Sequence, residues 1–163
     1  MYYGKLNKTD IANGPGVRVS LFVSGCRNRC RGCFNPETWN FKYGQPFTDD
    51  TLIEISRELE NDYISGLSIL GGDPMEIENR VPITSLCRVI KSTYPDKTIW
   101  LYTGYLYEDL MELDVMKYID VLVDGPFIEK YKDITLKFRG SKNQRIIDVQ
   151  KSRETGEVIL YEI

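Results

Sequence analysis

The sequence predicts an α/β fold arranged as a partial, open parallel β/α barrel. Short β-branched and apolar runs alternate with helical patterns, which is typical of βαβ units around a parallel sheet. Polar, glycine-rich segments follow three of these runs, at Gly71–Pro74, Thr103–Gly104 and Asp124–Pro126. The chain has 163 residues, too few for a full eight-unit barrel of about 250 residues. We therefore expect one domain over residues 1–163, with its ligand site at the carboxyl ends of the strands.

The first half of the chain predicts two strands and a helix. Val17–Val23 is β-branched and apolar, hence a strand. Ser24–Phe47 follows, and a connection of this length is uncommon in a compact domain unless it has a function. A helix is expected from Thr48, a good N-cap followed by two aspartates, to about Glu60. The next strand covers Gly66–Leu70.

The middle of the chain continues the alternation. A helix is predicted over Pro82–Thr93, because its apolar residues recur at helical spacing. These residues are Ile83, Leu86, Cys87 and Ile90. Thr98–Tyr102 is expected as a strand, Leu106–Leu113 as a short helix and Ile119–Val123 as a further strand.

Three later stretches have the composition of extended chain: Thr135–Phe138, Arg145–Val149 and Val158–Tyr161. The last two flank the polar run Glu154–Glu157. This arrangement predicts a C-terminal β-hairpin.

Composition excludes several classes of function. The net charge of −3 disfavours a general nucleic-acid binder. No run of about 18 apolar residues is present, so no membrane span is expected. The N-terminus lacks an apolar signal core, which favours a cytoplasmic location. The chain has no histidine, so Cys/His zinc sites, Ser-His-Asp triads and imidazole acid–base catalysis are excluded.

Three cysteines, Cys26, Cys30 and Cys33, are spaced C-x3-C-x2-C. In a reducing compartment such clusters indicate metal or redox chemistry. Three thiolates on one loop can hold three irons of a [4Fe-4S] cluster and leave the fourth for another ligand, whereas such clusters usually have four cysteines. One alternative is a zinc site completed by Cys87, and another is a ferredoxin-like electron carrier, which would need a fourth cysteine ligand. Cys87 falls on the apolar helix face, where we expect a core residue.

The cysteine motif resembles the hallmark of the radical S-adenosylmethionine (SAM) superfamily, CxxxCxxC after the first strand. Asn13–Arg18 and Ser24–Cys26 resemble the glycyl-radical-enzyme activases of that superfamily. Further stretches resemble the branch that activates anaerobic ribonucleoside-triphosphate reductase: Gly71–Pro74, Trp100–Tyr105, Leu122–Gly125 and Phe138–Arg145. The resemblance covers about Asp10 to Arg145 and implies a partial barrel of the radical SAM type.

The resemblance also implies roles for individual residues. The three cysteines would ligate the cluster, and the amino and carboxylate groups of SAM would bind its fourth iron. The Gly-Gly-Asp turn would bind the methionyl amino group, with Asp73 in place of the more widespread glutamate. The aromatic ring near the adenine would be Phe34. The implied SAM contacts are Gly32, Cys33, Phe34, Gly71, Gly72, Asp73, Tyr102 and Thr103.

The implied activity is oxidoreductase chemistry. One electron from the reduced cluster would enter the SAM sulfonium, and homolysis of the S–C5′ bond would yield methionine and a 5′-deoxyadenosyl radical. That radical would take a hydrogen atom from a glycine Cα in the large glycyl-radical subunit of the reductase. Hydrogen-atom transfer moves no net charge, so no side chain is expected as a catalytic acid or base. The implied partners are the reductase and an electron donor such as flavodoxin, with no direct nucleic-acid binding.

Several interpretations remain open at this point. The chain could activate another glycyl-radical enzyme, be another small radical SAM enzyme, or be an electron-transfer module without SAM cleavage. Asn13–Gly16 is a rigid turn or a partner contact, and Arg18 pairs with a carboxylate in the sheet or has a functional role. Arg139–Ser141 is a structural turn or a functional surface. Three arginines alternate with the cysteines and form either a solvated face or a docking site for an acidic electron donor: Arg27, Arg29 and Arg31.

Overall fold

A computed structural model describes residues 1–163, which form one seven-stranded sheet with helices. The strand order in the sheet is β3-β1-β2-β4-β5-β6-β7. The strands are β1 (Tyr2–Asp10), β2 (Val17–Val23), β3 (Gln45–Pro46), β4 (Ile64–Gly71), β5 (Thr98–Tyr102), β6 (Val121–Asp124) and β7 (Arg145–Asp148). The helices are α1 (Asp49–Leu59), α2 (Ile77–Thr93), α3 (Tyr107–Leu110) and α4 (Val149–Thr155), with 3-10 turns at Pro36–Trp39, Asp114–Lys117 and Glu129–Tyr131.

The middle of the sheet is parallel and both edges are antiparallel. Strands β2, β4, β5 and β6 pair in parallel, whereas β1 and β3 on one side and β7 on the other run antiparallel to their neighbours. The predicted α/β class and the four parallel strands are confirmed, and the sheet is open and mixed. None of the helices is both long and apolar enough to span a membrane.

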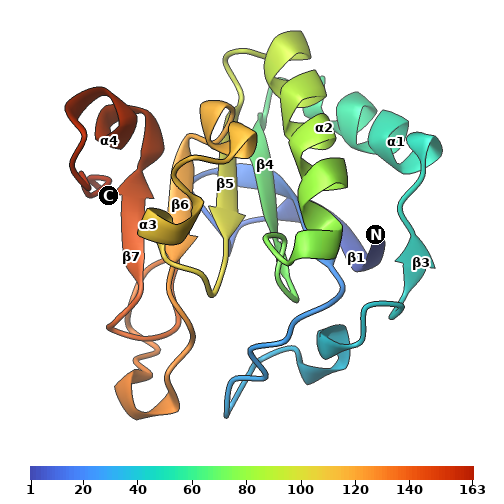
Figure 1. Ribbon diagram of the computed structural model, residues 1–163. Coiled ribbons are helices and arrows are strands. Elements are labelled where there is room, and N and C mark those ends of the chain that lie inside the picture. The colour runs from blue at the N-terminus through green and yellow to red at the C-terminus, as the bar shows by residue number, and fades with distance from the viewer.

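One face of the sheet packs against the helices. Figure 1 shows α2 lying across the middle strands, α1 beside it and α3 over β6. Alternate residues of the parallel strands, such as Leu21, Ile69 and Leu101, are fully buried on this side. Cys87 on α2 is among the core residues with no exposed surface, as predicted.

The opposite face carries a smaller aromatic cluster around Trp100 of β5. The rings of Phe138 and Tyr161 each lie 5.3 Å from the Trp100 ring, edge to face. Arg18 of β2 is fully buried on this side and lies 5.8 Å from the same ring. Its guanidinium donates to the Ser68 hydroxyl (2.8 Å) and to the Thr98 carbonyl (2.8 Å), so its partners are hydroxyls and carbonyls rather than the expected carboxylate. Burial lowers its pKa to about 10.

The turn before β2 is anchored to this face. Asp10 accepts hydrogen bonds from the Ala12 amide (2.8 Å) and the Asn13 side chain (2.6 Å). The Asn13 carbonyl accepts from Ser68, and two glycines in the turn have positive φ, Gly14 at 125° and Gly16 at 77°. The expected rigid turn at Asn13–Gly16 is therefore present.

Two predictions at the C-terminal end are wrong. Thr135–Phe138 forms turns and bends within the connection between β6 and β7 and does not pair as a strand. The expected hairpin is replaced by α4, which starts at an N-cap bond from the Lys151 amide to Asp148 and ends at Gly156 with φ 75°. The tail then returns along β7, through the Tyr161 amide to the Ile146 carbonyl at 2.8 Å.

Other elements differ from the prediction in extent or were not predicted. Helix α3 covers only Tyr107–Leu110 of the predicted Leu106–Leu113. Strand β1 was not predicted because its sequence, YYGKLNKTD, has few apolar residues. Helix α2 begins at Ile77 rather than Pro82, since polar side chains of its first turn bind neighbouring loops. The predicted helix from Thr48 is α1, with a capping box between Thr48 and Thr51.

Candidate functional site

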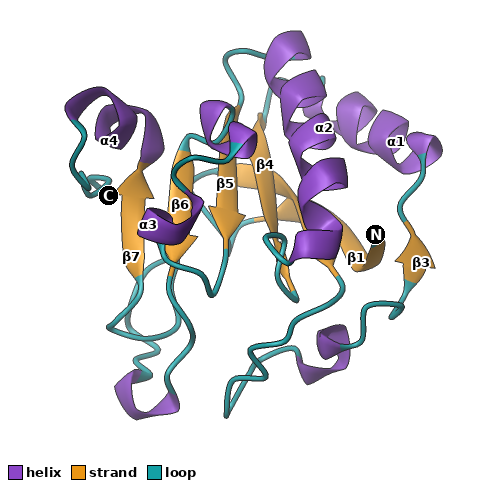
Figure 2. Cartoon of the chain, viewed as in Figure 1, coloured by secondary structure: helices purple, strands orange, loops and turns teal.

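Two long segments extend from the carboxyl ends of the parallel strands. Residues 24–44 follow β2 and carry the three cysteines, and residues 125–144 connect β6 to β7. In Figure 2 the arrowheads of β4, β5 and β6 point to the edge from which both segments hang. The fold thus brings together regions about a hundred positions apart in the sequence.

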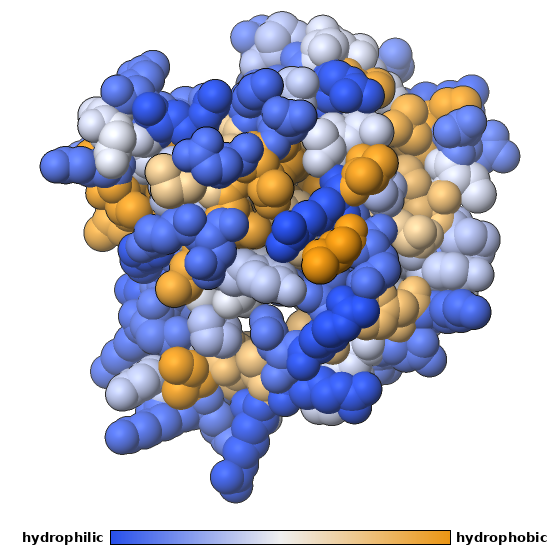
Figure 3. Space-filling view, in the orientation of Figure 1, coloured by the Kyte–Doolittle hydropathy of each residue, from blue (hydrophilic) through white to orange (hydrophobic).

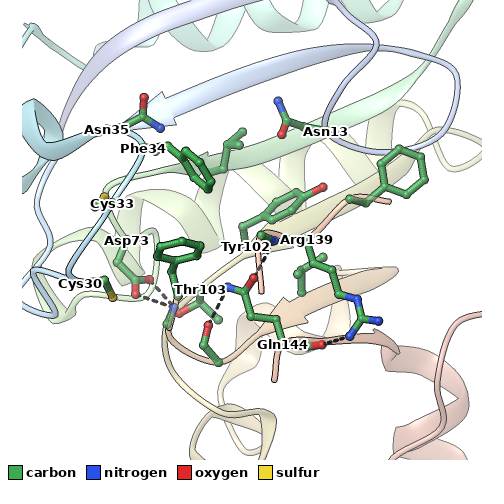
Figure 4. A pocket seen from close by; sticks show the side chains of 18 of the residues that line it. Asn13, Cys30, Cys33, Phe34, Asn35, Asp73, Tyr102, Thr103, Arg139 and Gln144 are labelled. Atoms are coloured by element: carbon green, nitrogen blue, oxygen red, sulfur yellow. Dashed lines mark hydrogen bonds between the residues drawn. The ribbon is translucent and has the colours of Figure 1, made fainter. Parts of the chain in front are cut away.

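A cavity of about 570 Å³ lies between these segments and the strand ends. Its size is within the range of about 300–1,000 Å³ typical of small-molecule sites. Cys26, Cys30 and Cys33 line it, as does the turn Gly71–Asp73. Figure 4 shows Cys30 and Cys33 near Asp73 at one end, with Asn13 and Tyr102 toward the other.

The backbone of the cysteine loop turns sharply between successive cysteines. Arg29 has φ 45° and Gly32 has φ 76°, and the Cys33 amide donates to the Cys30 carbonyl at 3.1 Å. Both residues are in the left-handed region, which is unfavourable for arginine and easy for glycine. These bends allow all three thiols to face one cavity.

The Gly-Gly-Asp turn is hydrogen-bonded to the start of the cysteine loop. The Gly72 amide donates to the Val23 carbonyl and the Asp73 amide to the Gly25 carbonyl, both at 2.7 Å. A Cβ at Gly72 would lie 2.7 Å from the Gly25 oxygen and 2.8 Å from the Thr38 oxygen. Because these are backbone atoms, only glycine fits here without moving the loop.

Asp73 is buried and held by three donors. The Thr103 hydroxyl (2.8 Å) and the Met75 amide (2.9 Å) donate to Oδ1, and the Gly104 amide donates to Oδ2 (2.9 Å). Burial raises the pKa of Asp73 to about 6, against the opposing effect of these bonds. A carboxylate has about four acceptor positions, so this one can still accept a bond from an ammonium group in the cavity.

The first turn of α2 clamps the residue after the first cysteine. Glu76 is 2% exposed and accepts from the Arg27 amide at 2.9 Å and from the Tyr105 hydroxyl at 2.5 Å. Glu78 forms two further bonds with the Arg27 guanidinium, at 2.8 and 2.9 Å. Asn79 donates to the Ser24 carbonyl at 3.1 Å. The hydrogen bond to Glu76 raises the pKa of Tyr105 to about 12.

The thiols fit a cluster better than a single ion. No three His, Cys, Asp or Glu side chains of the chain are grouped closely enough to hold one metal ion, and Cys87 lies in the core, away from the cavity lining. Burial raises the pKa of Cys26 to about 11 and also raises that of Cys30. Such thiols need a bound metal to become thiolates at neutral pH. Three thiols on a roomy cavity suit three corners of a cubane.

Tyr102 lines the same cavity and carries a buried polar group. Its hydroxyl is buried and has no hydrogen-bond partner, and burial raises its pKa. In Figure 4 the hydroxyl points away from Asp73 and Thr103. An unpartnered buried hydroxyl costs free energy.

The structure brings nearly all the predicted site residues to this cavity. Only Gly32 lies outside the lining, with the side chain of Glu129 beside it. Sequence reasoning missed the clamp by Glu76 and Asn79, for which no periodic pattern gave a signal. It also missed the wall formed by residues 125–144, although the motif Phe138–Arg145, most of which lies in this wall, had stood out.

Comparison with known proteins places the chain in a family. The profile of a family described as "4Fe-4S single cluster domain" matches residues 12–147. The anaerobic ribonucleoside-triphosphate reductase-activating protein of Enterobacteria phage T4 is 45% identical over 90% of this chain and 93% of its own length. Proteins of the same name from Vibrio cholerae serotype O1 and Escherichia coli (strain K12) are each 43% identical, over 90% and 88% of this chain and 97% and 96% of theirs.

The chain belongs to the anaerobic ribonucleoside-triphosphate reductase-activating protein family. The matched 4Fe-4S profile runs from the turn before β2 to β7, so it spans the cysteine region and the parallel strands of this chain. The family match supports a [4Fe-4S] cluster in this chain.

Proposed function

We propose that this protein activates anaerobic ribonucleoside-triphosphate reductase by generating its glycyl radical. One observation carries the proposal: three thiols and the Gly-Gly-Asp turn line the same cavity in a chain whose relatives are named as activators of that reductase. When bound, a [4Fe-4S] cluster and SAM would supply the electron and the 5′-deoxyadenosyl radical that removes the glycine hydrogen. In this proposal the whole chain is one radical SAM domain, and its open sheet is a partial barrel.

The residues of the chain would bind and orient these groups. Cys26, Cys30 and Cys33 would hold three irons. Asp73, fixed by its three donors, would accept a hydrogen bond from the methionyl ammonium. Phe34 would pack near the adenine, and the remaining contacts proposed for SAM are Gly32, Cys33, Gly71, Gly72, Tyr102 and Thr103. No side chain needs to move a proton.

The three arginines of the cysteine loop are candidates for a docking site of the electron donor. Arg27 is engaged with Glu76 and Glu78, and Arg31 lies 3.1 Å from Glu129. Arg29 lies over the Trp39 ring at 5.6 Å. Each arginine thus has a partner within the chain, which weakens the hypothesis that they form a free docking site for an acidic donor. An external donor such as flavodoxin, in the cytoplasm, remains part of the proposal.

The decisive experiment is SAM cleavage under anaerobic conditions. Protein reconstituted with iron and sulfide and reduced with dithionite should convert SAM to methionine and 5′-deoxyadenosine. With the reductase added, a glycyl radical doublet should appear in the EPR spectrum. Cys30→Ala should abolish both signals, whereas the matched variant Cys87→Ala should retain them.

The other outcomes of this experiment would each indicate a different function. A cluster without SAM cleavage would make the protein an electron-transfer module. SAM cleavage without a glycyl radical on this reductase would indicate a different glycyl-radical enzyme or a small-molecule substrate.

A further inference from the structure

Residues Pro126–Gln144, between β6 and β7, form an ordered loop whose two ends are joined by side-chain hydrogen bonds. The Gln144 side chain donates to the Gly125 carbonyl at 3.0 Å and accepts from two backbone amides of the loop. The Asn143 side chain donates to the Pro126 carbonyl at 2.8 Å. Connections longer than about 12–15 residues are uncommon in compact domains and usually carry function. We call this segment the 126–144 loop.

The 126–144 loop is one wall of the cavity and touches the cysteine loop. The Phe127 ring lies 5.0 Å from the Phe34 ring, and the Lys132 ammonium lies 5.4 Å from the same ring. Glu129 pairs with Arg31. Whatever binds on the outer side of this loop therefore lies next to the opening of the site.

The charge of the loop is opposite to that of the rest of the chain. Its five basic residues are Lys130, Lys132, Lys137, Arg139 and Lys142, against the acidic Glu129 and Asp133. The loop thus has a net charge of 5 − 2 = +3 in a chain of −3, which leaves −6 for the remainder. All four lysines are exposed, and none takes part in any of the ion pairs of the structure.

Exposed apolar side chains lie among these lysines. Ile134 is 88% exposed, Tyr131 42% and Ile128 36%. Figure 3 shows hydrophobic residues surrounded by hydrophilic ones at the lower left, where the loop hangs below the sheet. Apolar residues surrounded by unpaired charges of one sign are typical of a surface that binds a partner of the opposite charge.

We propose that the 126–144 loop is the docking surface for an acidic segment of the reductase that also carries an apolar side chain. Its carboxylates would pair with the lysines, and its apolar side chain would cover Ile134. This inference rests on the proposed function, because the segment belongs to the subunit whose glycine would enter the adjacent cavity. The lysines would steer the reductase toward the opening and set its affinity.

The test reverses charge at three lysines that do not line the cavity: Lys130→Glu/Lys137→Glu/Lys142→Glu. The matched control, Lys8→Glu/Lys117→Glu/Lys151→Glu, makes the same change in net charge at exposed lysines elsewhere. Binding of the purified reductase to each full-length, reconstituted protein is measured at low and high salt. The loop variant should lose about tenfold or more in affinity at low salt, whereas the control should change less than about twofold. The wild-type affinity should also fall with salt more steeply than that of the loop variant.

The binding results are interpreted together with the rate of SAM cleavage measured in the absence of the reductase. The loop variant should cleave SAM at the wild-type rate, because none of the three lysines borders the cavity. Unchanged reductase affinity in the loop variant would overturn the proposal. So would slower reduction by an acidic donor with unchanged reductase affinity, which would assign the lysines to the donor. Failure of the wild type to cleave SAM would refute the proposed function. The measured reductase affinities would still test the docking surface.

Discussion

Gly72→Ala tests whether the Gly-Gly-Asp turn positions the cysteine loop. The added Cβ would lie 2.7 Å from the Gly25 oxygen, 2.8 Å from the Thr38 oxygen and 2.9 Å from the Gly25 nitrogen. All three atoms are backbone, so no side chain can rotate away and the loop must move. Overpacking of this kind typically costs about 1–3 kcal/mol. At roughly 2–4 °C per kcal/mol for a chain of this size, the apo protein should melt about 2–12 °C lower.

The more specific effect is on the cluster. The cysteine loop meets the turn through the bond from the Asp73 amide to the Gly25 carbonyl, next to Cys26. Displacing the loop should move Cys26 relative to the other two thiols. We expect iron and sulfide content after reconstitution to fall by more than half, measured by chemical analysis and by the charge-transfer absorption of the cluster.

Gly156→Ala is the matched control for strain alone. Gly156 ends α4 with φ 75°, and nothing lies within 4 Å of its Cβ position. Alanine there should cost about 1–2 kcal/mol of backbone strain and leave cluster content unchanged. Wild-type cluster content and melting temperature in Gly72→Ala would refute the reasoning. They would show that the cysteine loop accommodates the added Cβ without loss of stability.

Three further predictions concern single side chains. Arg145→Met removes the cation that pairs with the fully buried Asp124 carboxylate, and it should lower the free energy of unfolding by about 3–5 kcal/mol in urea titrations; a loss under about 1 kcal/mol would contradict this. Glu76→Gln keeps an acceptor for the Arg27 amide but removes a buried negative charge near the thiols, so the midpoint potential of the loaded protein should rise at constant iron content. An unchanged potential would show that this charge is not felt by the cluster. Cys87→Ala should retain full iron content and lower the free energy of unfolding by about 1 kcal/mol, whereas iron loss would make Cys87 a ligand.

Local patterns predicted the parallel part of the fold well. Val17–Val23 is a strand with the predicted bounds, and the helix after Thr48 and the strand Thr98–Tyr102 are also confirmed. These elements are buried on their packing faces, so their composition carries a strong periodic signal. Strand β1 gave no such signal, because an antiparallel strand near an edge needs few apolar residues.

The C-terminal errors have a different cause. Val158–Tyr161 does run beside Arg145–Val149, but residues 149–155 form α4, so the two stretches are not joined by a hairpin turn. The helix there is short, and its capping residues Asp148 and Gly156 are also common in turns. Tertiary contacts with the sheet decided between helix and turn, and these contacts are not visible in a local window.

By itself, the sequence determined the chemistry of the site: three thiols spaced within one short segment, a Gly-Gly-Asp turn after a strand and no histidine to act as a base. These features are local, since bond geometry along a few residues dictates which atoms can meet. Only the tertiary structure decided what surrounds them, namely the clamp from Glu76 to Arg27, the free hydroxyl of Tyr102 and the basic wall of the 126–144 loop. Those contacts join residues dozens of positions apart, and their pairing depends on how the sheet orders its strands rather than on any repeat along the chain.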